Sequence, residues 1–199
     1  MPPQPGSAAA TAANATARNR RKQPEVTDIV DTIPEVIEPQ NSRDYLEVIS
    51  RAVFQAGVSW KQIASHWGAY RRAFGAFDPS AVASYGDAEV ARVLATPGVL
   101  RVERKVRATI ANAAALLKVQ ATFGDFAAYV ASFSDYDALA RDLKKRFSYL
   151  GDMNVWYVLF RTGFPVPRFE GWVATIRGEH PRMREMVERA RAAGRSREY

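Results

Sequence analysis

The stretch QAGVSW, residues 55–60, interrupts an apolar run that otherwise predicts a buried helix. A glycine inside a helix costs about 1 kcal/mol relative to alanine. Gly57 therefore indicates a point where the backbone conformation, or the close approach of a neighbour, matters more than local helix stability. Val58 and Trp60 follow at once and add an apolar group and a large aromatic ring at the same place. We take this stretch as the first candidate for a functional turn.

A second candidate lies at Leu139–Gly163, where an amphipathic helix, a tight turn at Gly151 and an apolar helix follow one another. This is the outline of a helix-hairpin-helix, whose backbone N–H groups can bind a phosphate. An ordinary helical hairpin in a core has the same pattern. The second glycine usual in the motif is absent, because Asp152, Met153 and Asn154 come next. We expect Asp152 to cap the second helix, with Gly151, Met153 and Asn154 as candidate DNA contacts.

Several kinds of chemistry are excluded by composition. The chain has no cysteine and two histidines, His66 and His180, so disulfides and thiolate-held clusters are impossible and we expect no metal site. No cofactor is indicated. The formal charge of +7 fits a polyanionic partner, but proteins that bind no nucleic acid can also have a basic surface.

The chain length of 199 residues fits one domain of ordinary size and a tail, and we expect a monomer. No apolar run reaches the roughly 20 residues of a membrane-spanning helix, and the N-terminus lacks the apolar core of a secretory signal. The absence of cysteine is typical of a reducing compartment. These features predict a soluble, cytoplasmic protein without a membrane partner.

Composition divides the chain near residue 40. Residues 1–40 form a tail and lead-in segment, which we expect to be disordered to about Val26 because it lacks periodic apolar residues. A basic cluster at residues 18–22 could touch phosphates or could simply solubilise the tail. The pattern of Thr27–Ile37 could support a short helix, broken by Pro34, that packs on the domain.

Residues 41–199 form the domain, and apolar spacings of three and four predict an all-α fold, since no alternating strand pattern of useful length is present. We expect helices at Ser42–Gln55, Trp60–Phe74, Val102–Gln120, Phe123–Ser132, Tyr136–Arg146, Met153–Gly163 and Arg168–Arg191. We expect two more between the second and third of these, one capped by Phe77–Ser80 and one that starts at Gly86–Glu89 and ends before Pro97.

Four blocks in this region resemble a known family. They are YLEVISRAVFQAGVSW, YRRAFGAFDP, GVLRVERKVRATIANA and FSYLG, in the order and at the spacing of 3-methyladenine DNA glycosylase I, a family of the helix-hairpin-helix glycosylase superfamily. The resemblance extends from about Ser42 to Pro167. It implies a helix-hairpin-helix glycosylase-like domain that acts on double-stranded DNA containing a modified base.

The resemblance also implies a role for the QAGVSW turn, which in such proteins faces the DNA. Val58 would enter the gap left by the extruded nucleotide, and Trp60 would form a wall of the pocket that receives the base. Gln55 and Gly57 would lie against the duplex, where a glycine allows close approach of the backbone. Trp60 could instead be an ordinary core aromatic residue.

Four further residues receive a role by the same resemblance. Tyr45 and Phe54 are weaker candidates for the base pocket. Arg104 and Lys105 would contact phosphates or support the cleft, although both could equally belong to a solvated helix start.

This sequence departs from the family at positions that carry chemistry. The family's base-recognising glutamate is replaced by Ala52, and its zinc clasp of cysteines and histidines is missing. Other superfamily members place a catalytic aspartate where Pro167 stands here, which leaves Glu170 nearby as a candidate catalytic carboxylate or as the first-turn acid of a helix. No lysine follows Gly151 closely, so lyase chemistry is not indicated.

Three functions remain open at this point. The first is a monofunctional DNA glycosylase of base-excision repair that flips a modified base, in our interpretation an alkylated purine, and hydrolyses its N-glycosidic bond. The second is a DNA-binding module of the same fold that does not cleave, which the missing carboxylates favour. The third is an enzyme that modifies a flipped base in DNA.

Overall fold

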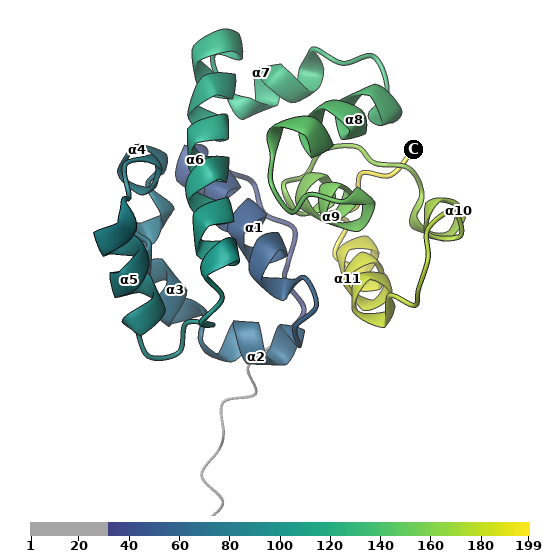
Figure 1. The fold of residues 1–199 in the computed structure, drawn as a ribbon. Coiled ribbons are helices and arrows are strands. Elements are labelled where there is room, and N and C mark those ends of the chain that lie inside the picture. Colours follow the sequence, from purple (N-terminus) through teal and green to yellow (C-terminus); the bar gives the residue numbers. More distant parts are fainter. Residues whose placement is uncertain (1–31) are drawn as a thin grey trace, which may run out of the picture.

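The computed structural model describes residues 32–199, and these form an all-α fold (Figure 1). Its α-helices are α1 (Ser42–Gln55), α2 (Trp60–Ser65), α3 (Trp67–Ala73), α4 (Pro79–Ala83), α5 (Asp87–Ala95), α6 (Glu103–Phe123), α7 (Phe126–Ala131), α8 (Tyr136–Arg146), α9 (Asp152–Arg161), α10 (Phe169–Val173) and α11 (Pro181–Ala192), with a 3-10 turn at Gly75–Phe77.

The longest helix, α6, organises the domain. It packs against α4 and α5 on one side and against α1 on the other, while α7 covers its C-terminal end (Figure 1). The helix α9 packs on α1 and α8, and its residues 155–161 are all buried. Because α1 contacts both α6 and α9, its C-terminal end is fixed between the two halves of the domain.

Side-chain caps explain where several helices begin. Asn41 accepts a hydrogen bond from the Arg43 backbone N–H at 2.9 Å, and Asp44 accepts one from the Gln40 backbone N–H at 2.7 Å. Asp125 and Asp135 cap α7 and α8 in the same way. Such caps satisfy N–H groups that a helix leaves unpaired at its start.

Two expected helices are each divided in the structure. The segment Trp60–Phe74 breaks at His66, whose φ of −116° and ψ of 7° are not helical, so α2 and α3 are separate. The segment Arg168–Arg191 breaks between α10 and α11, where Gly178 has a φ of 98° and Pro181 begins a new helix. Proline is tolerated in the first turn of a helix because its missing N–H would have no partner there.

The lead-in segment, described from residue 32, packs on the domain as expected, but its residues 32–40 are not helical, which corrects that part of the suggested short helix. The rest of the suggested helix lies outside the described residues. Ile33 and Val36 are buried. The Ile37 N–H donates to the Arg161 carbonyl at 2.7 Å, and Arg195 donates to the Val36 carbonyl at 3.4 Å. These bonds replace the intrahelical ones. The basic cluster and the expected disorder of residues 1–26 lie outside the described residues.

No helix of residues 32–199 combines the length and apolarity needed to cross a membrane.

Candidate functional site

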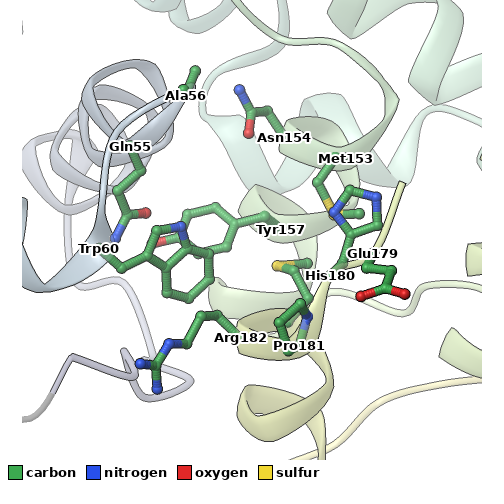
Figure 2. Close-up of a pocket in the computed structure, with 12 residues that line it drawn as sticks. Gln55, Ala56, Trp60, Met153, Asn154, Tyr157, Glu179, His180, Pro181 and Arg182 are labelled. Carbon is green, nitrogen blue, oxygen red and sulfur yellow. The ribbon is translucent and has the colours of Figure 1, made fainter. Parts of the chain in front are cut away.

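A cavity of about 350 Å³ opens where the α1–α2 turn, the start of α9 and the start of α11 meet. This volume lies in the range of small-ligand sites. Figure 2 shows the Trp60 and Tyr157 rings on one side of it, and His180 and Glu179 on the other. The lining comprises Gln55, Ala56, Gly57, Trp60, Met153, Asn154, Tyr157, Glu179, His180, Pro181, Arg182 and Met183.

The α1–α2 turn is a type II turn. The Val58 N–H donates to the Gln55 carbonyl at 3.1 Å, Ala56 has φ −58° and ψ 113°, and Gly57 has φ 70°. The third position of such a turn requires a positive φ, which glycine adopts without strain. A Cβ on Gly57 would have no atom within 4 Å. The backbone conformation, and not a close neighbour, therefore explains this glycine.

Lys105 holds the turn from inside the protein. Its ammonium donates to the Phe54 carbonyl at 2.9 Å and to the Ala56 carbonyl at 2.6 Å, and the side chain is 4% exposed. These carbonyls lie at the C-terminal end of α1, where helix dipoles favour a cation. Burial lowers the pKa of Lys105, and nearby Arg104 lowers it further.

Lys105 therefore supports the cleft, one of the two roles suggested for it, and is not placed to contact a phosphate. Its neighbour Arg104 is exposed on α6 and does not line the cavity.

The aromatic wall of the cavity is fixed from behind. Trp60 meets Tyr157 edge to face, with ring centroids 5.6 Å apart and an angle of 70° between the planes. The Tyr157 hydroxyl accepts a hydrogen bond from Arg161 at 3.1 Å, and Arg161 also donates to the Glu35 carbonyl at 3.1 Å. The lead-in segment is thus connected through Arg161 to the tyrosine that positions Trp60.

Gln55 contributes the buried polar group of the lining. It is the last residue of α1 and is 6% exposed, and its Nε2 has no hydrogen-bond partner within the described protein. A buried amide without a partner costs about 1–3 kcal/mol. The nitrogen is itself shielded from the cavity, so it does not reach a ligand there in this conformation.

The hairpin between α8 and α9 is held by two asparagines. Buried Asn112 of α6 accepts from the Ser148 N–H at 2.7 Å and donates to the Ser148 carbonyl at 3.1 Å. Asn154 donates to the Tyr149 carbonyl at 2.8 Å. The Asn154 side chain therefore stabilises the hairpin through this hydrogen bond and also forms part of the cavity wall.

The start of α9 presents its backbone to solvent. Gly151 is the exposed N-cap, and a Cβ there would have no atom within 4 Å. Asp152 does not cap the helix as expected. It is the first helical residue, and its carboxylate lies 2.6 Å from the Lys144 ammonium. Met153 points into the cavity lining.

Of the residues singled out in the sequence, the cavity brings together Gln55, Gly57, Trp60, Met153 and Asn154. Each comes from the α1–α2 turn or from the first turn of α9. Val58 and Gly151 lie beside the lining, not in it.

Tyr45 and Phe54 do not reach the cavity. Tyr45 packs on Phe126, with ring centroids 4.7 Å apart, on another face of the domain. Phe54 is fully buried against Tyr70 and Phe74. Their aromatic side chains serve the core, because the helical phase of α1 turns both away from the cavity that Gln55 faces.

Glu170 also lies outside the cavity, which removes the basis for a catalytic role. Its two oxygens accept hydrogen bonds from Arg191 at 2.7 and 2.9 Å, and it stands in the first turn of α10. The Arg191 guanidinium lowers the pKa of Glu170 to about 2. Glu170 is therefore placed as the acidic residue in the first turn of a helix, the second of the two roles suggested for it from the sequence.

Sequence reasoning missed seven residues of the lining, namely Ala56, Tyr157, Glu179, His180, Pro181, Arg182 and Met183. Tyr157 follows Met153 and Asn154 by one helical turn, so the sequence could have predicted that it lies on the same face of α9 as these two residues. Glu179, His180 and Arg182 lie at the break before α11, which we read as continuous helix. Pro181 was the available signal.

The family model described as methyladenine glycosylase matches residues 35–152, more than half of the chain. The chain belongs to this family. It is 30% identical to the DNA-3-methyladenine glycosylase 1 of Escherichia coli over 132 residues, which cover 56% of this chain and 71% of that protein. The DNA-3-methyladenine glycosylase of Haemophilus influenzae is 27% identical over 103 residues, covering 52% of this chain and 56% of the relative.

Solved structures of the family share the fold. A 3-methyladenine DNA glycosylase I superimposes with a TM-score of 0.54 at 29% identity, over 66% of this chain and 82% of that one. The Staphylococcus aureus enzyme gives a TM-score of 0.58 at 22% identity, over 65% and 80% of the two chains. The all-α fold of 3-methyladenine DNA glycosylase I, inferred from the sequence blocks, is confirmed by these matches.

Two family features are absent from the described residues. Ala52, at the position of the recognition glutamate, is 1% exposed and has no carboxylate to offer. No group of three or more histidine, cysteine, aspartate or glutamate side chains in residues 32–199 could hold a metal ion, so these residues do not fit the zinc clasp. In this chain, hydrogen bonds from Arg161 and Arg195 to backbone carbonyls hold the lead-in segment on the domain.

Proposed function

We propose that this protein is a monofunctional DNA glycosylase of base-excision repair, which extrudes an alkylated purine from duplex DNA and hydrolyses its N-glycosidic bond. The observation that carries this proposal is the cavity beside the type II turn, walled by Trp60 and Tyr157, in a chain of the methyladenine glycosylase family.

DNA would approach the two exposed backbone segments beside the cavity. Gly57 leaves the tip of the turn without a side chain, and Val58 next to it is half-buried and can fill the gap left by an extruded nucleotide. Gly151 leaves the N-terminus of α9 open, where N–H groups can bind a phosphate.

The extruded base would stack on Trp60. Base stacking on an aromatic side chain contributes about 1–3 kcal/mol, comparable with the few kcal/mol needed to unstack a damaged base. Because Tyr157 supports the Trp60 ring and is itself bound by Arg161, the wall is rigid before the base arrives. A rigid wall reduces the entropy lost on binding.

Hydrolysis would use Glu179 instead of Glu170. Breaking the N-glycosidic bond develops positive charge on the sugar, which a nearby carboxylate stabilises directly or through an activated water. Among the described residues that line the cavity, Glu179 is the one carboxylate, and it is exposed at the mouth.

A non-cleaving DNA-binding module remains the alternative, because no described Asp or Glu is fully buried in or near the cavity. A monomeric state and a cytoplasmic location remain predictions, which size-exclusion chromatography and localisation of a tagged chain would check.

Single-turnover assays of base release compare Glu179→Gln with Glu170→Gln. We expect base release to fall at least about 100-fold in the first variant and to stay unchanged in the second. An unchanged rate for Glu179→Gln would remove its role, and complete absence of release by the wild type would favour the binding module.

A further inference from the structure

The hairpin between α8 and α9 carries an aromatic side chain on an unusual backbone (Figure 1). Tyr149, in the middle of the hairpin, has a φ of 63°. This left-handed region suits glycine, and a bulky side chain there strains the backbone. Strain of this kind persists only where the surrounding structure holds it in place, and it concentrates at functional sites.

Neighbouring side chains hold the hairpin in this conformation. Asn112 binds both backbone groups of Ser148, at 2.7 and 3.1 Å, and Asn154 donates to the Tyr149 carbonyl at 2.8 Å. Leu150, the next residue, is 3% exposed. Because the chain is anchored on both sides of Tyr149, its left-handed conformation is fixed before any ligand arrives.

Core packing explains the other bulky residue with a positive φ. Among residues 32–199 the non-glycine residues with a positive φ are Ala76, Phe77 and Tyr149. Phe77 is fully buried, and its ring stacks on Trp67 and Phe74 with centroids 5.4 Å from each, so burial offsets the strain. Tyr149 is 36% exposed, and within the same residues its ring has no aromatic partner and its hydroxyl no hydrogen-bond partner. The fold alone therefore gives no reason for a tyrosine here.

The surroundings of Tyr149 indicate its partner. Asn154, which binds its carbonyl, also lines the cavity. Gly151 is the exposed N-cap of α9, where backbone N–H groups can bind a phosphate. Lys145, in the last turn of α8, is exposed and forms no ion pair within the described part of the chain. An exposed ring beside a cation and an open helix N-terminus fits a nucleic-acid backbone with its bases.

An aromatic ring has a use at the cavity mouth only if the duplex is distorted. Extrusion of a nucleotide unstacks the neighbouring bases and exposes their apolar faces, and proteins that kink DNA place apolar side chains against such steps. An intact duplex offers no such surface, because its bases are stacked. Val58 lies beside the α1–α2 turn and Tyr149 beside the start of α9, so the two approach the cavity from different elements.

We propose that Tyr149 is a second apolar contact to the kinked duplex, whose ring packs against the sugar and the unstacked base next to the extruded nucleotide. The strained hairpin holds this ring out for the DNA. This inference rests on the proposed function and deepens it, because it names a residue that recognises the open state of the duplex.

The test compares two duplexes of one sequence, one intact and one with a single tetrahydrofuran abasic-site analogue, which presents the gap of an extruded base without any chemistry. Dissociation constants of the full-length protein are measured by fluorescence anisotropy, and base release is measured separately on randomly methylated DNA. We expect Tyr149→Asn to weaken binding of the abasic duplex about 5- to 20-fold, and binding of the intact duplex less than about 2-fold.

The variants separate the ring from the backbone. Asparagine adopts the left-handed conformation more readily than most residues, so Tyr149→Asn keeps the hairpin. Tyr149→Gly removes both the ring and the strain and should show the same loss, which provides a second test if the asparagine variant folds poorly. Tyr149→Phe keeps the ring and should bind within about 2-fold of the wild type. Tyr199→Ala is the matched control, because Tyr199 is 69% exposed beside α7 and the start of α8, and it should change neither dissociation constant.

The outcomes distinguish this proposal from the proposed function. If Tyr149→Asn and Tyr149→Gly bind the abasic duplex like the wild type, or if Tyr149→Phe loses as much as they do, the ring contact is overturned, and glycosylase function stands wherever the wild type releases a base. If the wild type releases no base but prefers the abasic duplex in a Tyr149-dependent way, glycosylase function fails and the contact holds. Equal binding of both duplexes by the wild type would also overturn the contact.

Discussion

Replacing Lys105 by methionine tests how the turn beside the cavity is held. Two short hydrogen bonds from the ammonium satisfy the Phe54 and Ala56 carbonyls. Hydrogen bonds to a charged group contribute about 1.5–3 kcal/mol each, and the cost of burying the ammonium offsets part of this sum. We therefore expect Lys105→Met to lower the free energy of unfolding by about 2–4 kcal/mol.

For a domain of this size such a loss corresponds to a fall in Tm of roughly 5–15 °C. The assay is thermal and urea unfolding followed by circular dichroism, together with DNA binding at several salt concentrations. Arg104→Met is the matched control, since Arg104 is the exposed neighbour of Lys105 on α6. We expect it to change stability by less than about 0.5 kcal/mol.

The salt dependence distinguishes support of the turn from phosphate contact. Losing one phosphate contact reduces the slope of log K against log salt by about 0.9. We expect the slope of Lys105→Met to equal that of the wild type. A slope reduced by about one with unchanged stability would refute the structural role and restore the phosphate contact.

Three other predictions concern the wall, the turn and the C-terminal ion pair. Trp60→Ala should weaken binding of a flipped base about 10- to 100-fold by loss of stacking, while duplex without a modified base binds as before; equal losses on both DNAs in a titration would contradict this. Gly57→Ala should lower stability by about 1–2 kcal/mol, since its φ is 70°, and Gly57→Asn by less; chemical denaturation measures both, and a neutral alanine variant would rule out the strain. The pKa of Glu170 is held at about 2 by Arg191, below its ordinary value of 4.5, so the pair stabilises the fold above pH 4.5 and is lost as pH falls toward 2. Because the carboxylate is 47% exposed, solvent screening reduces the effect to about 1 kcal/mol, and Glu170→Gln should abolish this part of the acid destabilisation without altering base release; an unchanged acid profile would contradict the assignment.

Helix content and the position of the turn could be predicted from the sequence because both follow from local rules. Apolar spacing sets the helices, and a glycine that interrupts an apolar helical pattern indicates a special backbone conformation, which at Gly57 is a φ of 70°. The place of three cavity residues could also be predicted. The family resemblance predicted Trp60 in the pocket, and the hairpin pattern predicted Met153 and Asn154 at the start of the helix after the turn, where they line the cavity.

The remaining site depends on contacts distant in sequence. Lys105 lies about 50 positions from the carbonyls it binds, so nothing local distinguishes it from its exposed neighbour Arg104. Glu179 lies at a helix break that Gly178 and Pro181 mark in the sequence, but we interpreted the segment as one continuous helix. Glu170 had the right residue type, yet its partner Arg191 comes from another helix, and only the tertiary fold shows that pairing.

Base release from duplex DNA tests the central claim most directly. The purified protein is incubated with randomly methylated DNA and with duplexes that each carry one alkylated purine, and freed bases are identified by mass spectrometry. The proposed function predicts a free modified purine and an equal amount of abasic sites, both strongly reduced in Trp60→Ala. Tight binding of these duplexes without any freed base would contradict it.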